Sequence, residues 1–209
     1  MESAVASIEA QLAIVIGLVN SGQSARAMQL CQSLEISHSP HPAVLQLLTL
    51  LKLQAGATAD AKRHVAASLS LRPDHIPTLM LASEVARAAL DLPLAARTLK
   101  HVVHLAPEHV SAWFQLALVQ QDMQQLEAAI ASLRSLLRLT PERFDAEINL
   151  GIVLQECGQM DEAMRAYGRA YRLRADTFGR IAHALSTPQV GRLWLDLNQL
   201  KAVLQAAPA

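Results

Sequence analysis

Apolar residues recur along most of the chain at three- and four-residue spacing, which places them on one face of an α-helix. They form paired runs separated by a short polar break. One pair consists of the run with Trp113, Leu116 and Ala117, the break at 121–124 and the run that begins at Leu126. Two short amphipathic helices joined by a tight turn bury little surface alone, so the pattern predicts helical hairpins that stack in an all-α fold.

The hairpins repeat with a period of 34 residues. Pro73, Pro107 and Pro141 have this spacing, and each closes a similar phrase, namely SLSLRPDH, VVHLAPEH and LLRLTPER. One phase of the period also holds the same small residue in every unit, at Ala27, Ala61, Ala95, Ala129 and Ala163. The period predicts five contiguous units without insertion or deletion, at 8–41, 42–75, 76–109, 110–143 and 144–177.

Glycine and proline mark the ends of the predicted helices. Gly22, Gly56 and Gly158 fall at the turn inside a unit, where a positive φ costs glycine little. Pro42 and Pro77 fall at the start of a unit, where the first turn of a helix tolerates a missing N–H group.

The units resemble tetratricopeptide (TPR) repeats over residues 8–177. The signature small and large residues of that family occur in the fifth unit at Leu150, Gly151, Gly158, Ala163, Tyr167 and Ala170, and in the fourth at Trp113, Leu116, Ala117, Ala129 and Pro141. Departures are Val15, Thr49 and Ser83 at the second signature position, and Ser39 and Ala175 at the closing proline. The resemblance implies a right-handed α-solenoid, which we expect to form one domain over residues 1–209.

The last residues are expected to close the array as a C-terminal cap over 178–209. Residues 178–186 continue the phase as one more first helix, and Thr187-Pro188 ends it. Asp196 is the expected N-cap of a final helix, with Leu197, Leu200, Val203 and Leu204 on one face. Trp194 and the leucines beside it either cover the last repeat or dock on a partner, including a second copy of the chain.

Composition narrows the functional classes. Lys and Arg total 18, as do Asp and Glu, and the two signs are mixed along the chain, so no long-range field favours nucleic acid. The apolar run from Leu12 to Val19 is too short to span a membrane. Glu2 and Glu9 lie where a secretory signal has basic residues. We therefore expect a cytoplasmic protein with reduced cysteines, no nucleic-acid partner and no membrane span.

No catalytic, cofactor or metal motif is present. His101 and His104 form an i, i+3 pair without a third ligand, and His41, His75 and His109 share the last position of a unit, so both sets are interpreted as structural. Cys31 is expected to be a buried helical residue and Cys157 a thiol at a turn. Arg165, Arg169 and Arg172 form a stripe on one helix, interpreted as a solvated face in preference to an anion-binding patch.

By resemblance to TPR proteins, the first helix of each unit lines a concave groove through its fifth, ninth and twelfth residues. The predicted groove residues are Leu12, Ile16, Val19, Gln46, Leu50, Leu53, Met80, Glu84, Arg87, Phe114, Leu118, Gln121, Ile148, Ile152 and Gln155. Ten of these fifteen are apolar, which is typical of a groove for an amphipathic helix or hydrophobic peptide and also of helix-to-helix packing. The Lys and Asn pattern of the TPR carboxylate clamp is missing. Glu84 and Arg87 lie one turn apart, close enough to pair with each other, and we expect them to set the register of a ligand through one polar contact.

These observations predict a non-catalytic scaffold or adaptor that binds a protein or peptide partner in an apolar groove. Two alternatives remain open at the level of sequence. One is a holding chaperone for secretion or assembly substrates, although the TPR chaperones of that kind are usually shorter and acidic. The other is a separately encoded non-catalytic module of a glycosyltransferase or sulfotransferase system.

Overall fold

The computed structural model describes residues 2–37, 40–186 and 196–208, and all regular secondary structure within these residues is helical. The elements are α1 (Glu2–Asn20), α2 (Ser24–Ser37), α3 (Pro42–Gln54), α4 (Thr58–Leu71), α5 (Ile76–Ala88), α6 (Leu92–Leu105), α7 (Val110–Asp122), α8 (Leu126–Leu139), α9 (Phe144–Glu156), α10 (Met160–Leu173), the 3₁₀ turn η1 (Ala175–Thr177), α11 (Phe178–Leu185) and α12 (Leu197–Ala206).

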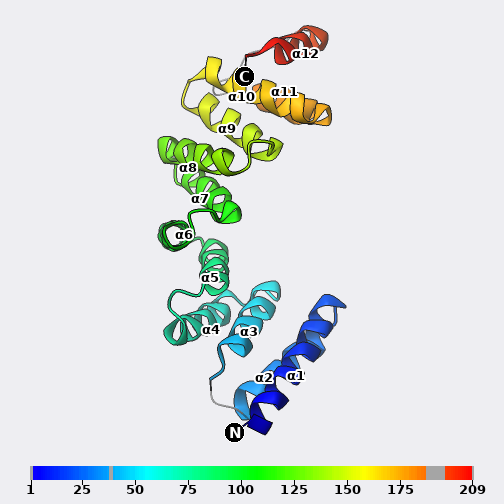
Figure 1. The fold of residues 1–209 in the computed structure, drawn as a ribbon, viewed down its shortest axis with the longest axis vertical. Helices are drawn as coiled ribbons and strands as arrows, with labels where there is room; N and C mark the ends of the chain where they lie inside the picture. Colours follow the sequence, from blue (N-terminus) through cyan, green and yellow to red (C-terminus); the bar gives the residue numbers. More distant parts are fainter. Residues whose placement is uncertain (1, 38–39, 187–195, 209) are drawn as a thin grey trace. The chain divides into compact units, whose positions relative to one another are not determined.

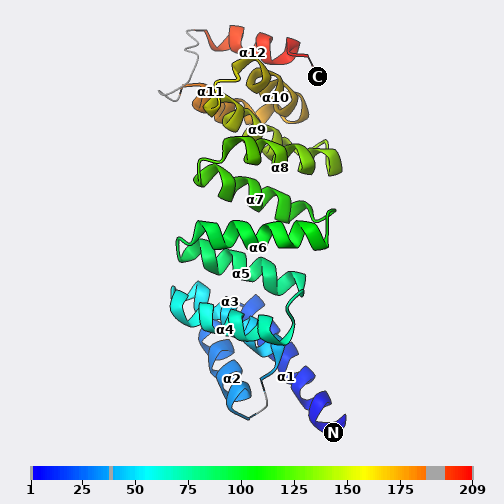
Figure 2. The same ribbon diagram turned by 90° about the vertical axis from the view of Figure 1, so that its left-hand side faces the viewer.

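The predicted helical hairpins are confirmed. Helices α3, α5, α7 and α9 each have 13 residues and begin at the first residue of a predicted unit, and each is followed by a 14-residue second helix. The two helices of each hairpin pack as antiparallel partners (Figures 1 and 2). Because each second helix contains the alanine of the fixed phase, and all five alanines are fully buried, the two helices of a hairpin approach closely there.

The chain divides into two compact units, residues 1–105 with α1–α6 and residues 106–209 with α7–α12. In the first unit, α1, α2 and α3 share a core that includes Val15, Cys31, Leu34 and Leu48. A second cluster joins α4 to α5 through Ala61, Val65 and Val85. Figure 2 shows the hairpins α3–α4 and α5–α6 as successive layers of this unit.

The second unit has one continuous core that extends from α7 to α12. Its largest fully buried side chain is that of Tyr167 on α10, whose ring lies directly over Gly151 on α9. A Cβ atom at Gly151 would lie 2.6 Å from Cδ1 of Tyr167. The small and large signature residues of the fifth repeat are therefore a packing pair, in which the missing side chain of one makes room for the ring of the other.

The turn inside every hairpin contains a residue with positive φ, and these residues are themselves 34 apart. Gly22, Gly56 and Gly158 have φ values of 74°, 73° and 76°, which confirms the prediction for the three glycines. In the two hairpins without glycine, Leu90 and Gln124 take φ values of 58°. The repeat thus imposes a left-handed residue at this position whatever its side chain.

The final helix α12 begins as expected. The carboxylate of Asp196 accepts hydrogen bonds from the backbone N–H groups of Asn198 (2.8 Å) and Gln199 (3.3 Å). Helix α12 packs on α10, and its buried residues are Leu200 and Leu204. Leu197, on the same predicted face, is 55% exposed. Trp194 and Thr187-Pro188 lie outside the described residues, and their predicted roles stay predictions.

Candidate functional site

An apolar hollow of about 420 Å³ lies on the first helices α1, α3 and α5 of the first unit. We call it the apolar hollow. Its lining residues are Leu12, Ile16, Ala43, Gln46, Leu47, Leu50, Pro77, Met80, Leu81 and Glu84. The nine groove residues predicted for this unit contribute six of them: Leu12, Ile16, Gln46, Leu50, Met80 and Glu84. The structure therefore brings together side chains from three successive repeats that the 34-residue register had placed on one face.

The apolar side chains of this hollow keep part of their surface in water. Ile16 is 48% exposed, and Leu12, Leu50 and Met80 are half-buried. Covering such surface is favourable by about 25 cal/mol for each Å² removed from water. Covering the partly exposed side chains of the hollow would therefore favour binding. Core residues such as Leu48 and Leu51 offer no such gain, because they are already fully buried in the folded protein.

The two polar side chains of the apolar hollow differ in their remaining capacity to contact a ligand. Gln46 Nε2 donates to His75 Nδ1 at 3.0 Å and to the Thr78 hydroxyl, so this amide is engaged in joining α3 to the start of α5. Glu84 is exposed, and in the part of the chain that the structure describes it forms no ion pair with Arg87, so its predicted contact with a ligand stays a prediction. The Glu84 carboxylate remains available at the edge of the hollow.

The other predicted groove residues of the first unit do not line the hollow. Val19 packs against the core of α1, α2 and α3, and Leu53 packs against the α4–α5 cluster. Arg87 is half-buried. Helix-to-helix packing, the alternative that the sequence left open, therefore accounts for two of the apolar positions.

In the second unit, α9 contributes less open surface than its sequence suggests. Ile148 and Gln155 are only 1% and 5% exposed, so neither presents a groove surface. The Gln155 side chain donates to the Ala184 carbonyl oxygen of α11 at 3.0 Å and accepts from the Tyr167 hydroxyl at 3.1 Å. The 34-residue register predicts both residues on the inner face of the repeats. In the structure they pack against α10 and α11 instead. Ile152 is half-buried against the same core.

The three predicted residues on α7 are half-buried. The guanidinium of Arg143 lies over the Phe114 ring, 4.8 Å from its centroid. Gln121 Nε2 donates to Glu156 Oε1 at 2.9 Å. Phe114 and Gln121 thus already contact partners within the unit. The third predicted groove residue on α7 is the apolar Leu118.

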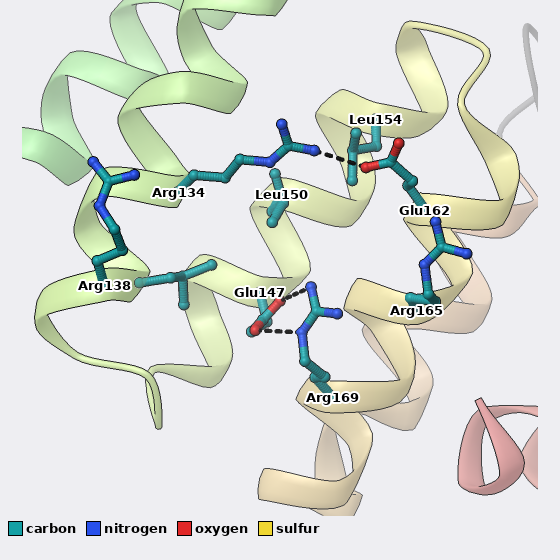
Figure 3. A pocket seen from close by; sticks show the side chains of 9 residues that line it. Arg134, Arg138, Glu147, Leu150, Leu154, Glu162, Arg165 and Arg169 are labelled. Atoms are coloured by element: carbon teal, nitrogen blue, oxygen red, sulfur yellow. Dashed lines mark hydrogen bonds and ion pairs between the residues drawn. The ribbon is translucent and has the colours of Figure 1, made fainter. Parts of the chain in front are cut away.

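Sequence reasoning missed a second hollow, of about 400 Å³, among α8, α9 and α10 (Figure 3). Four arginines line it, and only Arg165 and Arg169 belong to the stripe noted in the sequence. The third member of that stripe, Arg172, is separate, because its Nη1 donates to the Ala207 carbonyl oxygen of the C-terminal segment at 2.6 Å. The sequence did contain a signal for this hollow. Arg134 and Arg138 have the same i, i+4 spacing on α8 as Arg165 and Arg169 have on α10.

The histidines have structural positions. His41, His75 and His109 are the N-cap residues of α3, α5 and α7, and His109 Nδ1 accepts from the Ala112 N–H at 3.1 Å. His101 Nε2 lies 2.8 Å from a carboxylate oxygen of Asp74 on the surface. Within residues 2–37, 40–186 and 196–208, no group of three or more potential ligands is arranged to hold a metal ion.

The cysteines are free thiols in separate units. Cys31 is fully buried in α2, and this burial, with a smaller contribution from Glu35, raises the pKa of its thiol to about 11. Cys157 is half-buried at the end of α9, where burial and the carboxylates of Glu127 and Glu156 raise its pKa. Both thiols are thus protonated at neutral pH, which disfavours nucleophilic chemistry.

The repeated hairpins define a TPR α-solenoid. A tetratricopeptide repeat model matches residues 148–177, which lie within the fifth predicted unit. A second family model, described as ChAPs (Chs5p-Arf1p-binding proteins), matches residues 9–144, and the chain belongs to this family. Comparison of the sequence with curated proteins gives no match. Among the described residues, no helix is both long and apolar enough to cross a membrane.

Solved structures of MamA proteins share the fold. MamA 41-end from Desulfovibrio magneticus RS-1 aligns with a TM-score of 0.74 and 20% identity, covering 80% of this chain and 95% of that one. The crystal structure of MamA protein aligns with a TM-score of 0.73 and 16% identity over 81% of this chain and 92% of that one. At these identities the likeness concerns the fold alone.

Proposed function

We propose that the chain is a non-catalytic protein-interaction scaffold that holds a segment of a partner protein in the apolar hollow of α1, α3 and α5. The observation that carries the proposal is the convergence of partly exposed apolar side chains from three repeats on one hollow. Membership of a family named for the proteins that its members bind supports the same class of function. Fold alone does not give a function, so the argument rests on this surface.

The hollow favours a partner segment with one apolar face and a basic residue beside it. Apolar side chains of the partner would cover Ile16, Leu50 and Met80, and a Lys or Arg would meet the exposed Glu84 carboxylate. An amphipathic helix and an extended peptide both satisfy this description. The Glu84 contact contributes orientation more than affinity, because an exposed ion pair adds only about 0–1 kcal/mol.

The family description provides two direct probes, Chs5p and Arf1p. Each would be purified and titrated against the labelled chain, alongside capture of partners from a cell lysate. The variant that tests the proposal is Ile16→Glu. Its side chain is half-exposed, so a carboxylate there can stay hydrated in the free protein and is desolvated only when an apolar segment covers it.

A matched control is available in the same unit. Ile36 on α2 is 87% exposed and lies outside the apolar hollow, so Ile36→Glu makes the same chemical change elsewhere. We expect Ile16→Glu and Leu50→Glu to weaken partner binding about tenfold or more, with Ile36→Glu within about twofold of wild type. Circular dichroism should show unchanged helicity. Equal binding by Ile16→Glu, Leu50→Glu and wild type would defeat the proposal.

Leu118→Glu in the second unit extends this test to α7. Weaker partner binding by Leu118→Glu would show that this predicted groove residue also contributes to binding. The expected cytoplasmic location and the alternative of a homodimer through the C-terminal segment stay predictions.

A further inference from the structure

The hollow among α8, α9 and α10, here called the arginine hollow, has a local charge that the whole chain lacks. Arg134 and Arg138 lie on α8, and Arg165 and Arg169 lie on α10. Glu147 and Glu162 are the acidic residues of the lining, so four positive and two negative charges leave a net charge of +2. The chain as a whole has equal numbers of acidic and basic residues. The net positive charge is therefore local to the arginine hollow.

Two of the four arginines are already neutralised. Arg169 forms a two-pronged pair with Glu147, with Nε to Oε1 at 2.7 Å and Nη2 to Oε2 at 2.9 Å. Arg134 Nη2 donates to Glu162 Oε2 at 2.7 Å. Glu147 is only 4% exposed, so this carboxylate is held beneath the surface by its guanidinium partner.

The other two arginines have no carboxylate partner among the described residues. Arg138 donates to the hydroxyl of Ser135 at 2.8 Å, and Arg165 makes no ion pair in the part of the chain that is described. Figure 3 shows Arg138 and Arg165 on opposite sides of the hollow, with Leu150 and Glu147 between them. Each guanidinium offers the forked donor geometry that Arg169 already uses toward a carboxylate.

The position of the two free guanidinium groups on opposite sides of the hollow determines which kind of anion can contact both. A single phosphate or sulfate is compact and carries its charge at one point, whereas the two free guanidinium groups lie on opposite sides of the hollow. An extended segment with acidic residues at intervals can contact both, and it can lay an apolar side chain against Leu137, a half-buried residue of the lining. The distribution of charge therefore favours a peptide with spaced carboxylates over a small free anion.

We propose that the arginine hollow is a second binding site, which takes an acidic peptide segment of a partner protein through Arg138 and Arg165. It differs from the apolar hollow in unit, in helices and in ligand chemistry. The proposal does not depend on the proposed function, because the two surfaces share no residue.

The test uses the full chain and a fluorescein-labelled peptide built of Asp, Glu and Leu, followed by fluorescence anisotropy at low and high NaCl. Arg138→Gln with Arg165→Gln removes the two free guanidinium groups. Arg97→Gln with Arg180→Gln removes the same charge from exposed arginines that do not line the hollow. Because both double variants change the net charge equally, their difference isolates the site from general attraction.

We expect the wild type and the control double variant to bind the peptide equally within about twofold, and the site double variant to bind about tenfold more weakly. Arg138→Gln alone, at an exposed residue, should weaken binding several-fold without affecting the fold. A peptide with Asn and Gln in place of Asp and Glu should fail to bind. Ile16→Glu should leave acidic-peptide binding unchanged.

Four results would overturn the proposal: no binding by the wild type, equal loss in both double variants, equal binding of the amide peptide, or displacement of the acidic peptide by inorganic phosphate at equal concentration. The last result would instead assign the surface to a small anion.

Discussion

At the scale of single residues, backbone conformation is set by the repeat and only partly anticipated by residue type. Leu90 has a positive φ, as the turn glycines do, and its side chain is 85% exposed, so it gains little packing in return. A left-handed conformation costs a residue with a Cβ atom about 1–2 kcal/mol. The native fold tolerates this cost because the rest of the hairpin fixes the turn.

Leu90→Gly is therefore expected to stabilise the protein by about 0.5–1 kcal/mol, since relief of the left-handed strain exceeds the added entropy of glycine in the unfolded chain. Urea unfolding followed by circular dichroism measures the change. The reverse exchange at the equivalent turn, Gly56→Leu, should destabilise the protein, because its φ is 73°. A loss of stability in Leu90→Gly would mean that the leucine side chain matters more than its backbone.

The close contact between Gly151 and Tyr167 gives a second prediction at this scale. Gly151→Ala should destabilise the protein by about 1–3 kcal/mol despite the better helix propensity of alanine, because the new methyl group overlaps a fully buried ring. Gly17→Ala in α1 is the control. Apart from the adjacent backbone of α1 itself, nothing lies within 4 Å of a Cβ atom there, so that change should be stabilising by up to about 1 kcal/mol. Equal effects of both changes on the urea midpoint would show that the ring moves away freely.

At the scale of elements, the helices follow the sequence closely because each boundary is encoded locally. An N-cap histidine precedes α3, α5 and α7, with proline in the first turn of α3 and α5, and a left-handed residue follows the end of each of these helices. Asp196 caps α12 as expected for the same reason. What each helix packs against was harder to foresee, as the burial of Ile148 and Gln155 shows, since α11 and α10 supply the neighbours that decide their exposure.

Helix α12 offers a test of how an end element is held. Gly168 on α10 lets it approach, since a Cβ atom there would lie 2.6 Å from the Ala207 Cβ and 2.9 Å from the Leu204 carbonyl oxygen. Gly168→Ala combined with Arg172→Gln should detach α12 while α10 remains folded. Hydrogen exchange should then accelerate about tenfold or more in the amides of α12, with little change in α9.

The control for this prediction is Gly179→Ala in α11, where nothing lies within 4 Å of an added Cβ atom. That change should leave the exchange of α12 unaffected. If the Gly168→Ala, Arg172→Gln variant also keeps its protection in α12, then Leu200 and Leu204 alone are sufficient to hold this helix.

At the scale of the whole molecule, each compact unit has its own buried residues, and the second unit has a core that joins all of its helices. A fragment of residues 106–209 should therefore remain helical and unfold in a single cooperative thermal transition. Circular dichroism and calorimetry measure both properties. An unfolded fragment would favour the expected single domain over residues 1–209, which stays a prediction until this is measured.

The sequence by itself determined the repeat, the hairpins and the class of protein, because period, turn residues and small residues act over a few positions along the chain. It also placed six residues of the apolar hollow on one face, since helical register is regular. Only the tertiary structure decided which of the fifteen predicted positions remain open and which are covered. It alone brought the arginines of α8 and α10 to one hollow, because that juxtaposition depends on how second helices of neighbouring repeats stack across α9.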